Sequence, residues 1–425
     1  AMIALTTGNT NTAVGKNALM SITTGTYCTA LGTGALAANT GGYNTAVGAD
    51  SQIATTGGQF NSSVGTNSML ANTTGGYNTA FGYQALDANT TGDYNTALGT
   101  GTLSAITTGG RCTAVGNYAL AANTGTYNTG VGMYALTGNV SAQFNDAFGY
   151  NALGGTNTGE YNVSIGSYSM DANTSGQENV AVGNNALGLN TTGSYNVAVG
   201  RGVMQSNTTG QRNTALGMNA LNANTTASWN VAVGQNAGGA LTTGSYNVAV
   251  GTFALDTNTT SNNNTAVGHN SLTANTAADN VAVGYNALTA NTTGDAQVAV
   301  GSFALDANTT GQYNTAVGNH ALGANTSASS NTAVGQAALF YTSTGATNTA
   351  VGRDALHFNT TASNNVAVGY NALKANTTGT SNTAVGTNAL TTITTSNNCT
   401  AVGKDALKVN TAANNTKYLK HHIFD

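Results

Sequence analysis

Residues 78–94 read Asn-Thr-Ala-Phe-Gly-Tyr-Gln-Ala-Leu-Asp-Ala-Asn-Thr-Thr-Gly-Asp-Tyr, and close variants of this unit recur along almost the whole chain. The pentapeptide that opens the unit ends in a glycine, here called the repeat glycine, which occurs 24 times from Gly15 to Gly403. Twenty of the 23 intervals between repeat glycines are 17 residues long and three are 16. A fixed short period predicts a solenoid, in which each repeat buries its apolar face only against its neighbours.

Within one unit, the first five residues separate with a period of two into a cramped face of Asn and Ala and a bulkier face of Thr or Val and Val, which is typical of a strand. The Ala-Leu pair forms a second apolar segment, and Asn-Thr-Thr-Gly has the composition of a turn. The three short repeats each lose one residue inside this segment. Surface turns tolerate deletions, so the position of the loss indicates a surface turn. The sequence therefore predicts an all-β fold, a parallel β-solenoid or β-roll of about 24 rungs with a 17-residue repeat. At the ~4.8 Å strand spacing such a rod is roughly 115 Å long.

Equivalent positions in the repeats form columns. The residue four before the repeat glycine, here the strand asparagine column, is Asn in 20 rungs, Cys in three and Gln in one (Gln297). Asparagines in register can form amide ladders, and cysteine at this place indicates an enclosed site. The predicted ladder includes Asn44, Asn78, Asn95, Asn196, Asn247, Asn314 and Asn382.

The strand has two different faces. The residue two before the repeat glycine is Ala 21 times, so this face is cramped. The residues three before and one before it, here the outer columns, are mainly Thr or Val and then always Val, Leu, Ile or Phe. A strand that is apolar on both faces should be covered on both. The pattern therefore favours an oligomer around a long axis, with a three-sided monomeric coil as the alternative.

The residue five before the repeat glycine, here the aromatic column, is aromatic in 11 of the first 15 rungs and afterwards only at Tyr313. Such a stripe could contact glycan rings or could pack rung on rung. The candidate glycan-contact residues are Tyr27, Tyr43, Phe60, Tyr77, Tyr94, Tyr127, Phe144, Tyr161, Tyr195, Trp229 and Tyr246. The change near residue 250 predicts two zones of different surface character.

Composition excludes several classes of protein. Charged residues make up 6% of the chain, proline is absent, and 40% of residues are apolar and recur at fixed places, unlike disordered chains. The ten Lys and Arg residues are scattered, which disfavours nucleic-acid binding. No segment approaches the ~20 apolar residues that membrane insertion requires.

Chemistry-bearing residues do not converge on one place in the repeat. His269, His320 and His357 occupy three different repeat positions, which favours ordinary surface histidines. Carboxylates are dispersed without a calcium-loop pattern. We therefore expect no catalytic residues, no metal site and no cofactor, and we do not expect an enzyme.

Two further motifs have ordinary structural interpretations. Cys28 and Cys112 lie five rungs apart, about 24 Å, too far for a disulfide within one chain. Asn-x-Thr turns such as those at Asn89 and Asn291 match an N-glycosylation acceptor, but they are also simply the turn sequence, and turn chemistry is favoured.

The runs Tyr195 to Gly200 and Asn247 to Gly251 resemble the Asn-x-Val-Ala-Ile-Gly repeat of YadA-like trimeric adhesin heads, which are left-handed parallel β-rolls. The longer unit, as at Asn78 to Gly92, is similar to repeat arrays in bacteriophage tail fibres, cyanophages among them. This resemblance covers essentially the whole chain and implies a homotrimeric, extended fibre on a virion or cell surface. The 17-residue period is longer than that of the adhesin heads, so their detailed cross-section does not carry over.

These observations define the expected organisation and function. We expect one continuous array over residues 1–415, with a partial first rung at 1–10 and a cap or junction at 416–425. The expected role is the structural shaft of a phage tail fibre or cell-surface appendage that presents or contributes to host attachment. A carbohydrate-binding trimeric adhesin head that contacts a host glycan or receptor is the alternative, and an ice-binding solenoid is a more remote one.

Overall fold

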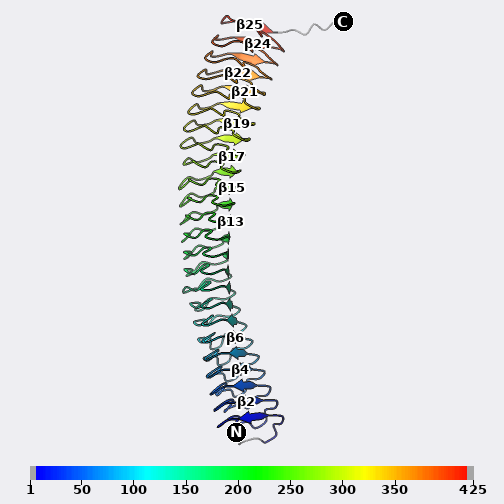
Figure 1. The fold of residues 1–425 in the computed structure, drawn as a ribbon, viewed down its shortest axis with the longest axis vertical. Helices are drawn as coiled ribbons and strands as arrows, with labels where there is room; N and C mark the ends of the chain where they lie inside the picture. The colour runs from blue at the N-terminus through cyan, green and yellow to red at the C-terminus, as the bar shows by residue number, and fades with distance from the viewer. Residues whose placement is uncertain (1–5, 419–425) are drawn as a thin grey trace, which may run out of the picture. The chain divides into compact units, whose positions relative to one another are not determined.

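The computed structural model describes residues 6–418, and within that range it contains 25 short strands and no helix. The chain divides into two compact units, Ala1–Asn213 and Thr214–Asp425. Within each unit the strands stack rung on rung along the chain (Figure 1). The predicted all-β parallel solenoid with one rung per repeat is confirmed. Residues 1–5 of the expected first rung and 419–425 of the expected cap lie outside the described residues.

The first unit holds twelve strands of three residues each. They are β1 (Thr12–Val14), β2 (Thr29–Leu31), β3 (Thr45–Val47), β4 (Ser62–Val64), β5 (Thr79–Phe81), β6 (Thr96–Leu98), β7 (Thr113–Val115), β8 (Thr129–Val131), β9 (Asp146–Phe148), β10 (Val163–Ile165), β11 (Val180–Val182) and β12 (Val197–Val199).

The second unit holds thirteen strands of the same length. They are β13 (Thr214–Leu216), β14 (Val231–Val233), β15 (Val248–Val250), β16 (Thr265–Val267), β17 (Val281–Val283), β18 (Val298–Val300), β19 (Thr315–Val317), β20 (Thr332–Val334), β21 (Thr349–Val351), β22 (Val366–Val368), β23 (Thr383–Val385), β24 (Thr400–Val402) and β25 (Thr416–Tyr418). Strand β25 pairs with β24 in parallel, so the ladder continues into the first residues of the expected cap or junction.

Within each unit, successive strands pair in parallel with equivalent residues opposite one another. Across a 16-residue interval the register is kept, because Thr29 of β2 still pairs with Thr45 of β3. The missing residue is absorbed by the turn around Thr40, which is exposed. The deletion therefore changes the turn and leaves the strands aligned.

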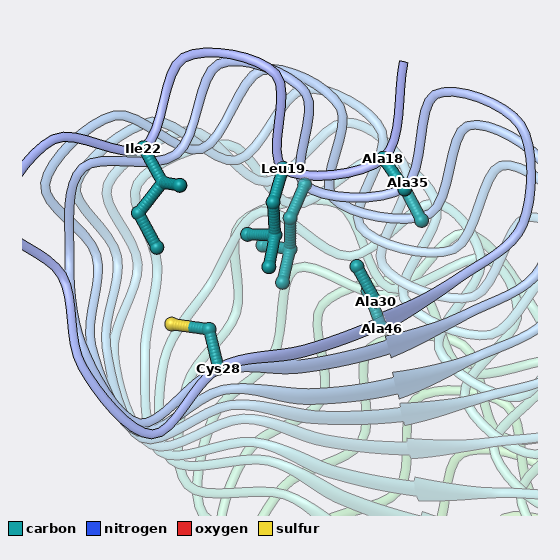
Figure 2. Close-up of a cluster of buried hydrophobic side chains, with 8 residues drawn as sticks. Ala18, Leu19, Ile22, Cys28, Ala30, Ala35 and Ala46 are labelled. Carbon is teal, nitrogen blue, oxygen red and sulfur yellow. The ribbon is translucent and has the colours of Figure 1, made fainter. Parts of the chain in front are cut away.

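The cramped strand face points into the coil and the bulkier face points outward. The middle residue is buried in every strand from β2 to β24, whereas the two flanking residues are half-buried or exposed. Around the first rungs, Leu19, Ile22, Cys28 and Ala30 point toward one another across the coil (Figure 2). The thin interior is thus filled by small residues on the strand side and by larger ones on the opposite wall.

The leucine of each Ala-Leu pair has an unexpected backbone conformation. Leu19 has a φ of 48° and Leu86 a φ of 57°, in the left-handed region that costs a residue other than glycine roughly 1–2 kcal/mol. Both side chains are fully buried. The backbone N–H of Leu86 donates to the carbonyl oxygen of Thr102 in the next rung at 2.9 Å. Burial and this hydrogen bond offset the strain, and the conformation turns the leucine into the core.

The repeat glycine is required by both conformation and space. At Gly82 the φ angle is +142°, and an added Cβ would lie 2.5 Å from the carbonyl oxygen of Gly99 in the next rung. No L-residue is comfortable at such a φ, and the backbone of the next rung leaves no room. The invariance of this column therefore follows from the close stacking of the rungs.

Candidate functional site

The strand asparagine column forms a buried amide ladder. The Oδ1 atom of each predicted member accepts the backbone N–H of the next residue in the column, with distances of 2.9–3.1 Å. For example, Asn78 accepts from the N–H of Asn95 at 2.9 Å and donates through Nδ2 to the carbonyl oxygen of Gly92 at 2.8 Å. Both side-chain groups are therefore satisfied inside the coil.

The asparagine of Asn-Thr-Thr-Gly forms a second buried column that the sequence reasoning missed. Asn89 Nδ2 donates to Asn72 Oδ1 at 3.0 Å and to the carbonyl oxygen of Gly92 at 3.1 Å. Asn89 and Asn291 are both fully buried. Their amide nitrogens are therefore shielded from a glycosylating enzyme, which supports the structural interpretation of the Asn-x-Thr motif.

This turn asparagine column is interrupted where an apolar residue replaces Asn. Ile106 follows Asn89 in the column, and Ile393 follows Asn376. The Oδ1 atoms of Asn89 and Asn376 are buried without a hydrogen-bond partner. An unpaired buried acceptor is unfavourable by about 1–3 kcal/mol, so these rungs are weaker points of the ladder.

The first threonine of the turn also bonds along the stack. Thr73, Thr74 and Gly75 all direct their backbone N–H groups at the carbonyl oxygen of Thr90 in the next rung, at 2.9–3.3 Å. The hydroxyl of Thr73 donates to the same oxygen at 2.9 Å. The Thr73 hydroxyl therefore adds a side-chain hydrogen bond to the stacking of adjacent rungs.

The cysteines occupy the strand asparagine column and are all free and buried. Cys28 Sγ lies 3.4 Å from the carbonyl oxygen of Gly41 and accepts from Asn39 Nδ2 at 3.5 Å. Burial raises the pKa of the Cys28 and Cys112 thiols above their ordinary value. These thiols are therefore inert core groups.

The aromatic column of the first unit is a stack of rings. Ring centroids on successive rungs are 4.8–5.2 Å apart and the ring planes differ by 15° or less. The stacked runs are Tyr27, Tyr43, Phe60, Tyr77 and Tyr94, followed by Tyr127, Phe144 and Tyr161. Ring faces inside a run cover one another and only the edges face solvent. This geometry supports rung-on-rung packing, because a sugar ring stacks on an aromatic face.

The remaining members of the column are less regular. Arg212 lies over the ring of Tyr195, with its guanidinium carbon 5.0 Å from the centroid. In the second unit Trp229 and Tyr246 stack at 6.4 Å. Tyr313 is 61% exposed. The continuous stacking of the aromatic column therefore stops before the second unit begins.

The second unit carries a different aromatic array, which includes all three histidines of the described residues. The rings of His269 and Tyr285 stack at 5.7 Å, and those of His320 and Phe303 at 4.9 Å. Further along, His357 stacks on Phe340 at 5.5 Å. Edge-to-face contacts join these pairs into one array from Phe253 to Phe358. The histidines are thus neighbours of aromatic rings rather than isolated surface groups.

Charged groups gather in few places. Asp354 lies 3.3 Å from Lys374 Nζ and 3.6 Å from His357 Nδ1. Asp87, Asp171, Asp256 and Asp306 share one repeat position, and partial burial raises the pKa of each carboxyl group. Among the described residues no group of three or more His, Cys, Asp or Glu side chains could hold a metal ion.

Fold, register and ladders together define the chain as a β-solenoid repeat protein. The comparisons with protein-family models and with curated proteins found no match to the chain. No helix within residues 6–418 is long and apolar enough to cross a bilayer.

Proposed function

We propose that this chain is the structural shaft of a fibre, in a phage tail or a cell-surface appendage, and that it assembles as a homotrimer. The observation that carries the proposal is the apolar outer face of the strands. Val317 of β19 and Val334 of β20 remain 36% and 37% exposed although the alanines beneath them are fully buried. A contiguous exposed apolar column marks an interaction surface, and further copies of the chain around a common axis would cover it.

The interior supports a role as a stiff spacer. Within each unit, backbone hydrogen bonds join each rung to its neighbours, and the two asparagine columns add a line of side-chain amide bonds. The strand asparagine column is a satisfied buried polar network, and such networks rigidify a core and specify one arrangement. A shaft of this kind would hold an attachment surface away from the particle or cell that bears it, and its role is mechanical rather than catalytic.

The assembly is tested by light scattering with small-angle X-ray scattering on the purified chain. We expect a mass of about three chains of 42.1 kDa each. A double variant, Val317→Lys with Val334→Lys, places charges on the apolar column and should yield single chains. The matched control Thr310→Lys puts a charge on an exposed turn residue and should leave the mass unchanged. A wild-type mass of one chain would refute the trimer.

A further inference from the structure

The aromatic column is interrupted at Glu178, and an open cavity lies at the interruption. The cavity has a volume of about 450 Å³ and is lined by Tyr161, Glu178 and Val180. One face of the Tyr161 ring stacks on Phe144, with centroids 5.0 Å apart and planes within 4°. The other face is turned toward the rung that carries Glu178, where no aromatic ring follows.

The same column shows which group fits such an interruption. Arg111 also stands between two tyrosines of the column. Its guanidinium carbon lies 5.6 Å from the ring centroid of Tyr94 and 5.4 Å from that of Tyr127. One guanidinium therefore fills the gap between tyrosines that are two rungs apart. Tyr161 and Tyr195 are likewise two rungs apart, with Glu178 at the equivalent place.

The backbones at the two interruptions are alike. Arg111 has a φ of 61° and Glu178 a φ of 53°. The N–H of Arg111 donates to the carbonyl oxygen of Asp93 at 3.0 Å, and the N–H of Glu178 donates to that of Glu160 at the same distance. The two places therefore share the backbone conformation and hydrogen bond of the residue itself, while the turn before Tyr127 is one residue shorter than the turn before Tyr195.

The charge at the interruption is opposite to that of Arg111. Aromatic faces carry negative potential, so they attract a cation and do not attract a carboxylate. Glu178 is exposed, and none of the ion pairs within residues 6–418 includes it. Glu160 and Glu178 are the two glutamates of the sequence and stand on successive rungs. Ring faces beside an unpaired carboxylate are complementary to a planar cation.

We propose that Tyr161, Glu178 and Tyr195 form a slot that binds a guanidinium group. The guanidinium stacks between the two rings as Arg111 does between Tyr94 and Tyr127, and its N–H groups donate to the Glu178 carboxylate. The guanidinium can belong to a small molecule or to an arginine side chain on a partner. The slot lies within the first unit, and Val180 at its edge belongs to the outer face that the proposed assembly would cover, so binding is measured on the assembly that light scattering finds.

The test uses the full chain and ligand-observed NMR. The probes are N-acetyl-arginine methylamide and the peptide Gly-Arg-Gly, and N-acetyl-lysine methylamide is the non-planar control. We expect a Kd on the order of 1 mM for the arginine derivative and upfield shifts of the protons next to its guanidinium, caused by the ring currents of both tyrosines. The lysine derivative should bind at least about fivefold more weakly, because it lacks the planar stacking group.

Variants of Glu178 and Arg111 distinguish a loss of guanidinium binding from a loss of folding. Glu178→Gln should weaken binding at least about tenfold, and Glu178→Arg should abolish it because its own guanidinium fills the slot. The second variant should fold normally, since Arg111 stands at an equivalent place, and circular dichroism checks this. Arg111→Glu should open a second slot and double the number of ligands bound.

The outcomes are decisive in both directions. Absence of an upfield shift with the wild-type chain, or unchanged binding to a folded Glu178→Arg variant, would overturn the proposal. Tighter binding of Gly-Arg-Gly than of the arginine derivative supports an arginine on a protein partner. Equal binding of the two supports a small molecule as the source.

Discussion

Truncating one asparagine of the strand column should destabilise the coil locally. In Asn78→Ala, the N–H of Asn95 loses its 2.9 Å acceptor and the carbonyl oxygen of Gly92 loses its 2.8 Å donor. The Gly92 oxygen keeps a second donor, Asn89 Nδ2 at 3.1 Å, but the Asn95 N–H is left buried and unpaired. Two lost hydrogen bonds and one orphaned donor together amount to about 3 kcal/mol.

A glutamine at the same place is the matched control. In the native chain Gln297 occupies this column, and its Oε1 accepts the N–H of Asn314 at 3.2 Å while its Nε2 donates to the carbonyl oxygen of Gly311. Asn78→Gln can therefore keep both hydrogen bonds, and its loss of stability should be clearly smaller than that of Asn78→Ala.

Hydrogen exchange measured by mass spectrometry is the appropriate assay, because unfolding of a long repeat array need not be two-state. A loss of about 3 kcal/mol corresponds to about a hundredfold faster exchange, and it should be concentrated in peptides that contain Asn95 and the adjacent rungs. Exchange that is no faster in Asn78→Ala than in Asn78→Gln would refute the ladder argument. An equal effect on distant rungs would contradict the nearest-neighbour picture.

Three further predictions follow from the packing. Gly82→Ala should lower the free energy of unfolding by at least about 2 kcal/mol. In Gly188→Ala the added Cβ would meet its nearest atom at 3.5 Å, so the free energy of unfolding should change by less than about 1 kcal/mol. Thermal melting measures both variants. Burial raises the pKa of Asp256 above 3.8, so its contribution to stability is greatest below that pH and is lost as the pH rises through the folded-state pKa. Asp256→Asn should therefore raise the melting temperature at neutral pH slightly and flatten its pH dependence; a lower melting temperature at neutral pH would contradict this. Cys28 and Cys112 should resist alkylation in the native chain and react after denaturation, as followed by mass spectrometry.

The strands and their register could be predicted from the sequence because the period is nearly constant and each position keeps its chemistry. The conformation of the opposite wall could not. Leu86 sits in an Ala-Leu pair that has no glycine or asparagine to signal a positive φ, yet its φ is 57°. Stacking fixes this conformation, because the leucine must both enter the core and donate its N–H to the next rung. Tertiary context therefore overrides local propensity wherever a leucine stands at this position.

The surface was predictable only where a column is strict. The aromatic column was found because its members share one repeat position. The second array was missed because His269, His320 and His357 stand one, two and five residues after a repeat glycine. These positions become neighbours only when the coil is built and side chains of adjacent rungs meet on one edge. The turn asparagines were missed for a related reason, because Asn-Thr-Thr-Gly indicates a turn without showing that its first side chain points inward.

The distribution of polar groups explains how such short strands hold their register. A strand of three residues makes few ladder bonds, and a slip along its neighbour would be weakly opposed by backbone bonding alone. Asn78 changes this, because its amide is buried and satisfied only when Asn95 and Gly92 lie at their observed places. Gly82 adds a steric condition, since the next rung must present a backbone without a side chain against it. Any slip would leave a buried amide unpaired or bring a Cβ into the backbone, so polar and steric terms specify the stacking that the apolar core stabilises.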